Sequence, residues 1–219
     1  MKSIILLTLA CLTAAFADED KSFFNGTDLT GWSCTSPQYW SVKDGVIIGG
    51  SAERIPHNEF IWANVEVKDF YLAVDVKLEP NTGNGGIQFR SQKKPPFEAL
   101  GYQADVGKGC WGTLYHESGR GLLDKNTRGG KAVKPGEWNH YEILAFGHRI
   151  WTALNGQLAT AYYDPKGELT GFIAFQVHGG APQTVSYRPL KLVHNPKIEF
   201  IGLTEAQLNA ELQPSYKPE

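Results

Sequence analysis

Apolar and polar positions alternate with a period of two through most of the chain. Segment 70–78 is the clearest case, because every second position is apolar: Phe70, Leu72, Val74, Val76 and Leu78. Successive side chains of a strand point to opposite faces, so this pattern predicts a strand that is buried on one face only. Similar patterns predict strands near 87–90, 102–106, 138–146, 149–154, 158–163, 172–178 and 185–193.

Turn signals separate these strands. Asp44-Gly45 and Asn155-Gly156 each lie between apolar runs, and both dipeptides favour tight hairpins. A helix is expected only at residues 204–212, where Thr204 can cap it with Gln207 as the capping-box partner. Many short strands with no helices between them favour a sandwich over βαβ units. We therefore expect an all-β fold, a jelly roll of two antiparallel sheets with a short C-terminal helix.

The first 17 residues predict export. Lys2 precedes an apolar run over 4–16, and Ala15-Phe16-Ala17 has the small-x-small form of a signal-peptide cleavage site. The run is too short for a membrane span, and this length makes an N-terminal anchor helix a weaker alternative. A lipoprotein lipidated at Cys11 is a weaker alternative, because Thr8 stands where Leu is usual. We expect a signal peptide at 1–17, one jelly-roll domain at 18–200 and a helical tail at 201–219, in the periplasm or outside the cell.

The amino-acid composition limits the classes of molecule that the protein is expected to bind. The net charge is −2 and no basic cluster is present, which argues against nucleic acid and acidic membranes. The 6 Trp and 9 Tyr suit sugar rings, although most aromatic side chains fill a core. Cys34 and Cys110 remain after cleavage; they either form a disulfide or stay as free thiols. The sequence leaves the oligomeric state open.

Three predicted strands share one pattern, an apolar face and a face that carries an amide beside a charged or titratable group. The pairs are Gln88 with Arg90, Gln103 with Asp105, and Gln176 with His178. Amides hydrogen-bond hydroxyls and titratable groups move protons, whereas an ordinary solvated face carries more Lys, Glu, Thr and Ser. We therefore predict a carbohydrate site on one sheet face.

A second cluster follows the Asp105 strand. His116 and Glu117 are adjacent there, and such a pair offers an acid and a base of different pKa. In a strand only one of them would face the site, whereas in a loop both could, and a solvated loop with no function is an equally weighted alternative. Candidate aromatic contacts to the sugar are Tyr102, Trp111 and Tyr115.

Motifs for other chemistry are missing from the sequence. There is no HExxH, CxxC, P-loop or GxSxG. We expect no metal and no cofactor. Binding of a divalent cation such as calcium is an alternative only if the fold brings together Asp105, His116, Glu117 and His178.

The order and spacing of several segments are similar to a known family. The segments are Phe24–Trp32, Trp40–Ile47, Gly83–Ser91, Gly101–Val106, Gly112–Ser118, Trp138–Ile143, Leu154–Gly156 and Phe175–Gly180. Between about Phe24 and Val193 the chain resembles the 3-keto-disaccharide hydrolase domain family. The resemblance implies a concanavalin A-like jelly roll, export from a bacterium and glycan breakdown.

The resemblance also implies a reaction. Active relatives cleave glycosides already oxidised at C3, by elimination, by hydration of the resulting enone, or by both. A C3 ketone acidifies the C2 hydrogen, so that a base can form an enolate and the C1 substituent then leaves. This chemistry needs a base, an acid for the leaving oxygen and a donor for the enolate oxygen, not the paired carboxylates of ordinary glycosidases.

The chain departs from the family pattern at three places. His116 stands where Asp is usual, Arg120 lies in an interrupted basic pair, and Tyr187-Arg188-Pro189 replaces Phe-Arg-Asn. Our hypothesis takes Asp105 or His116 as base and Glu117 or His178 as acid. Arg90, with Gln88 or Gln176, would donate hydrogen bonds to the enolate and the hydroxyls.

Two other classes compete with the enzyme. A non-catalytic carbohydrate-binding domain would use the same fold and face, and would present an open aromatic platform without convergent titratable groups. A structural module would expose an apolar patch instead. Perturbed pKa values in a closed pocket favour the enzyme.

Overall fold

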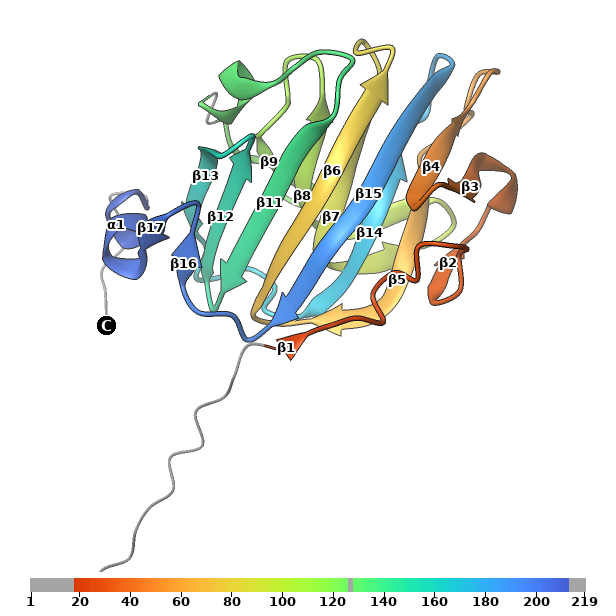
Figure 1. Ribbon diagram of the computed structural model, residues 1–219. Helices are drawn as coiled ribbons and strands as arrows, with labels where there is room; N and C mark the ends of the chain where they lie inside the picture. Colours follow the sequence, from red (N-terminus) through yellow and green to blue (C-terminus); the bar gives the residue numbers. More distant parts are fainter. Residues whose placement is uncertain (1–17, 126–127, 213–219) are drawn as a thin grey trace, which may run out of the picture.

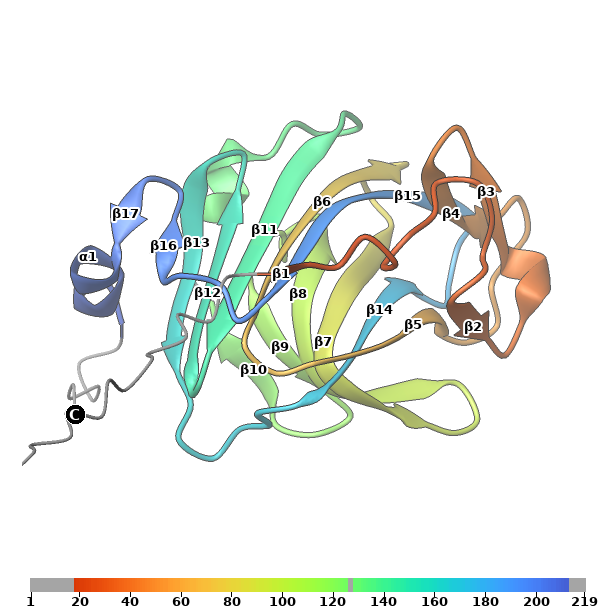
Figure 2. The ribbon, with the colours of Figure 1, turned by 60° about the horizontal axis from the view of Figure 1, so that its bottom comes forward.

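The computed structural model describes residues 18–125 and 128–212. Two large antiparallel sheets pack face to face, as Figures 1 and 2 show. Sheet A has the order β13 (Gln157–Tyr163), β12 (Arg149–Leu154), β11 (Asn139–Phe146), β6 (Phe70–Glu79), β15 (Gln183–His194), β4 (Val46–Ser51) and β3 (Trp40–Lys43), with β1 (Asp18–Glu19) also paired to β15. Sheet B has the order β10 (Gly121–Asp124), β9 (Leu114–Glu117), β8 (Glu98–Gly107), β7 (Asn84–Lys94), β14 (Gly171–Val177), β5 (Glu59–Val67) and β2 (Trp32–Cys34). The predicted jelly-roll sandwich is confirmed.

Strand β6 forms as its alternation predicts. Its five apolar positions are at most 1% exposed and face the core between the sheets. The predicted turns also form, because Lys43 pairs with Val46 across Asp44-Gly45 and Leu154 pairs with Gln157 across Asn155-Gly156. Asp44 and Asn155 both have a positive φ, as such tight turns require.

The C-terminal segment covers one edge of sheet A. Helix α1 (Glu205–Ala210) follows a two-stranded ribbon of β16 (Glu199–Phe200) and β17 (Leu203–Thr204). The capping box of Thr204 and Gln207 is present as predicted. Leu208 is fully buried against the outer face of β12, where the Trp151 indole N–H donates to the Leu208 carbonyl at 3.0 Å.

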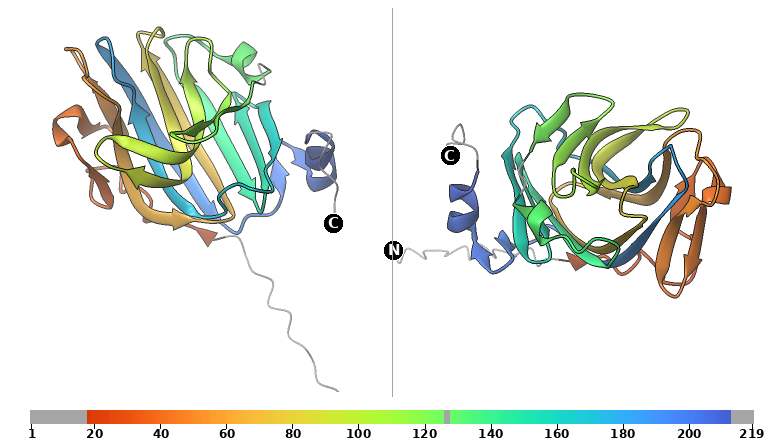
Figure 3. Two further views of the ribbon diagram at one scale, coloured as in Figure 1. Left: turned by 180° about the vertical axis from the view of Figure 1, so that it is seen from behind. Right: turned by 90° about the horizontal axis from the view of Figure 1, so that it is seen from above.

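The hairpin of β7 and β8 continues beyond sheet B and folds across its outer face, where Figure 3 shows it crossing the sheet. The bend follows a register shift between Phe89 and Gln92. Three contacts hold the hairpin against the outer face. Ala99 packs with Phe60 and Trp62. Glu98 accepts a hydrogen bond from the Asn58 amide at 3.2 Å, and Phe97 stacks on His57. The hairpin therefore covers part of the outer face of sheet B.

Several expectations concern the ends and the cysteines. The signal peptide expected at 1–17 lies outside the described residues. In the part of the chain that the structure describes, no helix is long and apolar enough to cross a membrane. Cys34 and Cys110 are free thiols, so the structure contains no disulfide between them.

Candidate functional site

The outer face of sheet B carries the predicted polar side chains. Strand register places Gln88 of β7 opposite Gln103 of β8, and Asp105 of β8 opposite Gly86 of β7. Gln176 of β14 lies on the other side of Gly86. Tyr115 and Glu117 of β9 continue the face, because Tyr115 is paired with Gln103. The expectation that Gln88, Gln103, Asp105 and Gln176 share one face is confirmed.

A chain of hydrogen bonds orients the amides of this face. The Ser91 hydroxyl donates to Gln88 Oε1 at 2.9 Å, Gln88 Nε2 donates to Gln103 Oε1 at 2.6 Å, and Gln103 Nε2 donates to Asp105 Oδ1 at 2.7 Å. The Thr113 hydroxyl donates to the other oxygen, Asp105 Oδ2, at 2.6 Å. Gly86 makes room for this chain, since a Cβ there would lie 2.5 Å from the Gln103 side chain. The Asp105 carboxyl group is therefore held by two donors.

Asp105 is only 7% exposed, and this burial controls the protonation of its carboxyl group. Loss of solvation raises its pKa to about 6, against the hydrogen bonds from Thr113 and Gln103 and the charge of His178, which lower it. A carboxyl group with this pKa exists in both protonation states near neutral pH, as a group that takes up and releases protons requires.

This raised pKa predicts a pH dependence of stability. The folded state holds the Asp105 proton at pH values where the unfolded chain has released it, so stability falls as pH rises from about 4 to about 6. The difference between the folded and unfolded pKa corresponds to a loss of about 3 kcal/mol in the free energy of unfolding. We expect Asp105→Asn to lack this decrease when the free energy of unfolding in urea is plotted against pH between 4 and 7. Asp44→Asn, at an exposed turn, should keep the decrease. An unchanged slope in Asp105→Asn would contradict the buried carboxyl group.

Glu117 and His178 stand near Asp105. Burial raises the pKa of the half-buried Glu117, and the charges of Glu98 and Asp105 raise it further, while His178 lowers it. His178 lies just beyond β14, is exposed, and its Nδ1 lies 2.6 Å from the Gly179 carbonyl oxygen. The face thus brings together two carboxyl groups of raised pKa and an accessible imidazole.

Gln176 has unmet hydrogen-bonding capacity. Its side chain is fully buried, and neither its amide nitrogen nor its amide oxygen has a partner. Beneath it, the Tyr187 hydroxyl of sheet A donates to the Gln176 backbone carbonyl at 2.6 Å and accepts from the Gly86 N–H at 3.2 Å. Buried polar groups are normally paired, so this amide is an unsatisfied group in the interior.

The unpaired amide predicts an unusual substitution. We expect Gln176→Met to raise the free energy of unfolding by about 1–3 kcal/mol, because it removes two unsatisfied buried atoms and keeps a similar volume. Gln88→Met is the matched control, and should destabilise because it breaks bonds to Ser91 and Gln103. Urea unfolding measures both. Equal destabilisation by the two variants would mean that Gln176 is paired after all.

Arg90 does not lie on this face, which corrects the sequence prediction. Its backbone is left-handed (φ +48°) within the irregular stretch of β7, so simple alternation fails there. The guanidinium group is 1% exposed and holds loops at one end of the sandwich. It donates to the Lys68 and Gly147 carbonyls, each at 2.7 Å, and to Asp69 Oδ1 at 3.2 Å.

His116 also lies elsewhere, on the opposite side of β9 from Glu117. It packs edge-to-face on Tyr102, and its Nε2 is 3.0 Å from Glu168 Oε2. Tyr102 itself is buried between the sheets, stacked on Phe89, and its hydroxyl donates to Asp164 at 2.6 Å. The structure therefore separates His116 and Tyr102 from Asp105, because neighbouring residues of a strand face opposite ways.

Trp111 belongs to the main core, at 6% exposure, with its indole N–H 3.3 Å from Asn81 Oδ1. Sequence reasoning missed two residues of this face, Thr113, which donates to Asp105, and Glu98, whose charge acts on Glu117. The spacing of Thr113 from Asp105 gives no signal in the sequence, and Glu98 reaches the face only because the start of β8 folds over it. Among the described residues, no three His, Cys, Asp or Glu side chains are grouped to hold a metal ion.

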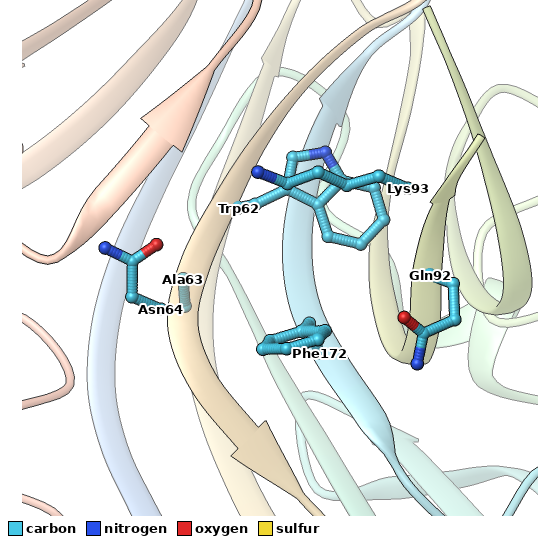
Figure 4. A pocket seen from close by; sticks show the side chains of 6 residues that line it. All are labelled: Trp62, Ala63, Asn64, Gln92, Lys93 and Phe172. Carbon is cyan, nitrogen blue, oxygen red and sulfur yellow. The ribbon is translucent and has the colours of Figure 1, made fainter. Parts of the chain in front are cut away.

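An aromatic pocket opens on the same face, on the other side of the hairpin. It has a volume of 410 Å³ and is lined by Trp62, Ala63, Asn64, Gln92, Lys93 and Phe172 (Figure 4). Its aromatic rings come from neighbouring strands, Trp62 from β5 and Phe172 from β14. The outer face thus has a buried acid–amide part and an aromatic part.

The antiparallel jelly roll with buried carboxyl and amide groups on one sheet face, together with the family that its sequence matches, defines a domain of carbohydrate-related function. The chain is a member of the family of 3-keto-alpha-glucoside-1,2-lyase-like domains, whose family model matches residues 19–193. The predicted family is confirmed. No curated protein matches the chain.

Solved structures share the fold. A candidate glycosyl hydrolase from Parabacteroides distasonis is 22% identical, with a TM-score of 0.57 over 80% of this chain and 92% of the other. The carbohydrate binding module CBM66 from Bacillus subtilis is 18% identical, with a TM-score of 0.55 over 75% of this chain and 97% of the other. A non-specific endo-beta-1,3(4)-glucanase is 11% identical, with a TM-score of 0.50 over 82% and 88%.

Proposed function

We propose that the protein is a glycan-degrading enzyme that cleaves glycosides oxidised at C3. The observation that carries the proposal is Asp105, a buried carboxyl group with a pKa of about 6, fixed by two donors beside Glu117 and His178. Family membership supports the oxidised substrate. We propose that the reaction uses these side chains without a cofactor, and the predicted signal peptide would place it outside the cytoplasm.

The proposed steps follow from the placement of these groups. Asp105 takes the C2 proton as a carboxylate, and the electron pair of the C2–H bond forms the enolate. The enolate then expels the C1 substituent; the C1–O bond breaks, and Glu117 or His178 gives the leaving oxygen a proton. A water molecule added across the resulting enone completes a net hydrolysis.

Gln176 is our choice of donor to the enolate oxygen, and substrate binding has to uncover its fully buried amide. Its amide N–H group has no partner in the protein, whereas Gln88 Nε2 is already committed to Gln103. A donor left free for the oxygen where charge develops stabilises the transition state more than the ground state. Arg90 and His116 take no part in these steps, because they lie away from this face.

The test uses an aryl 3-keto-glucoside, in both anomers, with the unoxidised aryl glucoside as control. We expect release of the aglycone from the oxidised substrate only, and the enone or its hydrate by mass spectrometry. In deuterium oxide the hydrated product should gain deuterium at C2, which direct displacement at C1 would not introduce. Release from the unoxidised glucoside alone would refute the proposal.

A carbohydrate-binding domain is the second candidate, and the aromatic pocket of Trp62 and Phe172 favours it. Binding of unoxidised glycans without turnover of either substrate would select this candidate. A structural module is disfavoured, because the exposed large apolar side chains of the described residues are Leu100, Leu122 and Leu190, which lie on separate strands.

A further inference from the structure

The aromatic pocket on the outer face of sheet B has the composition of a small-ligand site. Its volume of 410 Å³ falls in the usual range for such sites. The half-buried Phe172 supplies flat apolar surface beside the largely buried Trp62, while Asn64, Gln92 and Lys93 supply hydrogen-bonding groups (Figure 4). Three of the six lining side chains are polar, so the pocket is not simply an apolar surface left exposed to solvent.

The polar groups are placed to meet a ligand. Asn64, Gln92 and Lys93 are exposed, and Lys93 lies over Trp62 (Figure 4), with its Nζ donating to Ser33 Oγ at 3.0 Å. Lys93 pairs with Ala99 in the hairpin, and Ala99 packs in the same cluster as Trp62, which fixes the side of the hairpin that faces the sheet. No acidic side chain lines the pocket, and Glu66, opposite Phe172 in the register, lies outside it.

The pocket is separate from the Asp105 part of the face. Trp62 is opposite Ala174, and Ala174 is opposite Gln88, so Trp62 lies two strands from Gln88, or roughly 10 Å at the usual strand spacing. The folded-over hairpin and buried Ala99 stand on this side of the face. A ligand in the pocket would therefore contact neither Asp105 nor Glu117.

We infer that this pocket is a second carbohydrate-binding site, which takes an unoxidised pyranose ring of a glycan. The ring stacks on the half-buried Phe172 beside the edge of Trp62, which is only 5% exposed, and its hydroxyls bond to Asn64, Gln92 and Lys93. An aromatic ring presents the flat surface that the C–H groups of a sugar can cover, and amide and ammonium groups bond to hydroxyls. Such a site would hold a polymer near the Asp105 face without itself needing the C3 ketone.

Calorimetric titration tests the inference with maltotetraose, cellotetraose and laminaritetraose, which are unoxidised. We expect at least one to bind with a Kd of about 1 mM or tighter. Phe172→Leu and Lys93→Met should each weaken this binding by about three- to tenfold. Phe146→Leu is the matched control, a half-buried Phe on sheet A, and should leave binding unchanged. Lys93 is exposed, so its variant keeps the test valid if Phe172→Leu folds poorly.

Three results would overturn the inference. The first is that none of the three glycans binds. The second is that both pocket substitutions leave the binding unaffected. The third is that Asp105→Asn abolishes the binding, which would place the sugar on the Asp105 face instead. The tetrasaccharides carry no ketone, so the binding result does not depend on whether the protein cleaves 3-keto-glucosides. Either proposal can therefore be refuted while the other stands.

Discussion

Arg90→Met is expected to lower the free energy of unfolding by about 3–5 kcal/mol, the range for breaking a buried charged pair by removing one partner. The Arg90 guanidinium is 1% exposed and joins two turns, through the Lys68 carbonyl and the Asp69 carboxylate in one and the Gly147 carbonyl in the other. Methionine keeps the apolar stem but leaves these acceptors without their donor. The turn between β5 and β6 should loosen first, since it holds Lys68 and Asp69.

Urea unfolding measures this loss, with Arg188→Met as the matched control. Arg188 is 39% exposed in its pair with Asp75, so its removal should change stability by less than about 1 kcal/mol. If Arg90→Met unfolded like the parent protein and lost turnover instead, Arg90 would act at the site rather than in the loops.

Asp105→Asn is expected to reduce turnover of a 3-keto-glucoside by about 10²–10⁴-fold, the usual contribution of a positioned general base. The amide has nearly the same shape and cannot accept the C2 proton. In the parent protein, turnover should rise with pH through about 6, because the base must be deprotonated and burial raises its pKa to that value. This rise should be missing from any residual activity of the variant.

His116→Gln distinguishes the two sides of β9. His116 contacts Glu168 and Tyr102 behind the sheet, so the variant should keep turnover within about tenfold of the parent, at temperatures where thermal unfolding confirms that both are folded. A loss as large as that of Asp105→Asn would assign the base to His116, the alternative that the sequence left open.

Much of the fold follows from local pattern. The alternation in β6, the Asp44-Gly45 and Asn155-Gly156 turns and the Thr204 capping box all form where the sequence predicts them. Each depends on residues a few positions apart, so the sequence alone contains the information. Alternation also identified the face shared by Gln88, Gln103, Asp105 and Gln176, because regular pairing preserves side-chain direction across strands.

The rest of the site depends on contacts between distant segments. A left-handed residue at Arg90 and the adjoining register shift turn one strand away from its expected face, and no local rule requires this at an arginine. The folded-over hairpin brings Glu98 toward Glu117, and the sheet register leaves Gln176 unpaired. The sequence by itself therefore determined the sheet sandwich, the family and most of the polar face. Only the tertiary structure decided which charged groups share that face, because burial and pairing arise from residues brought together by long-range packing.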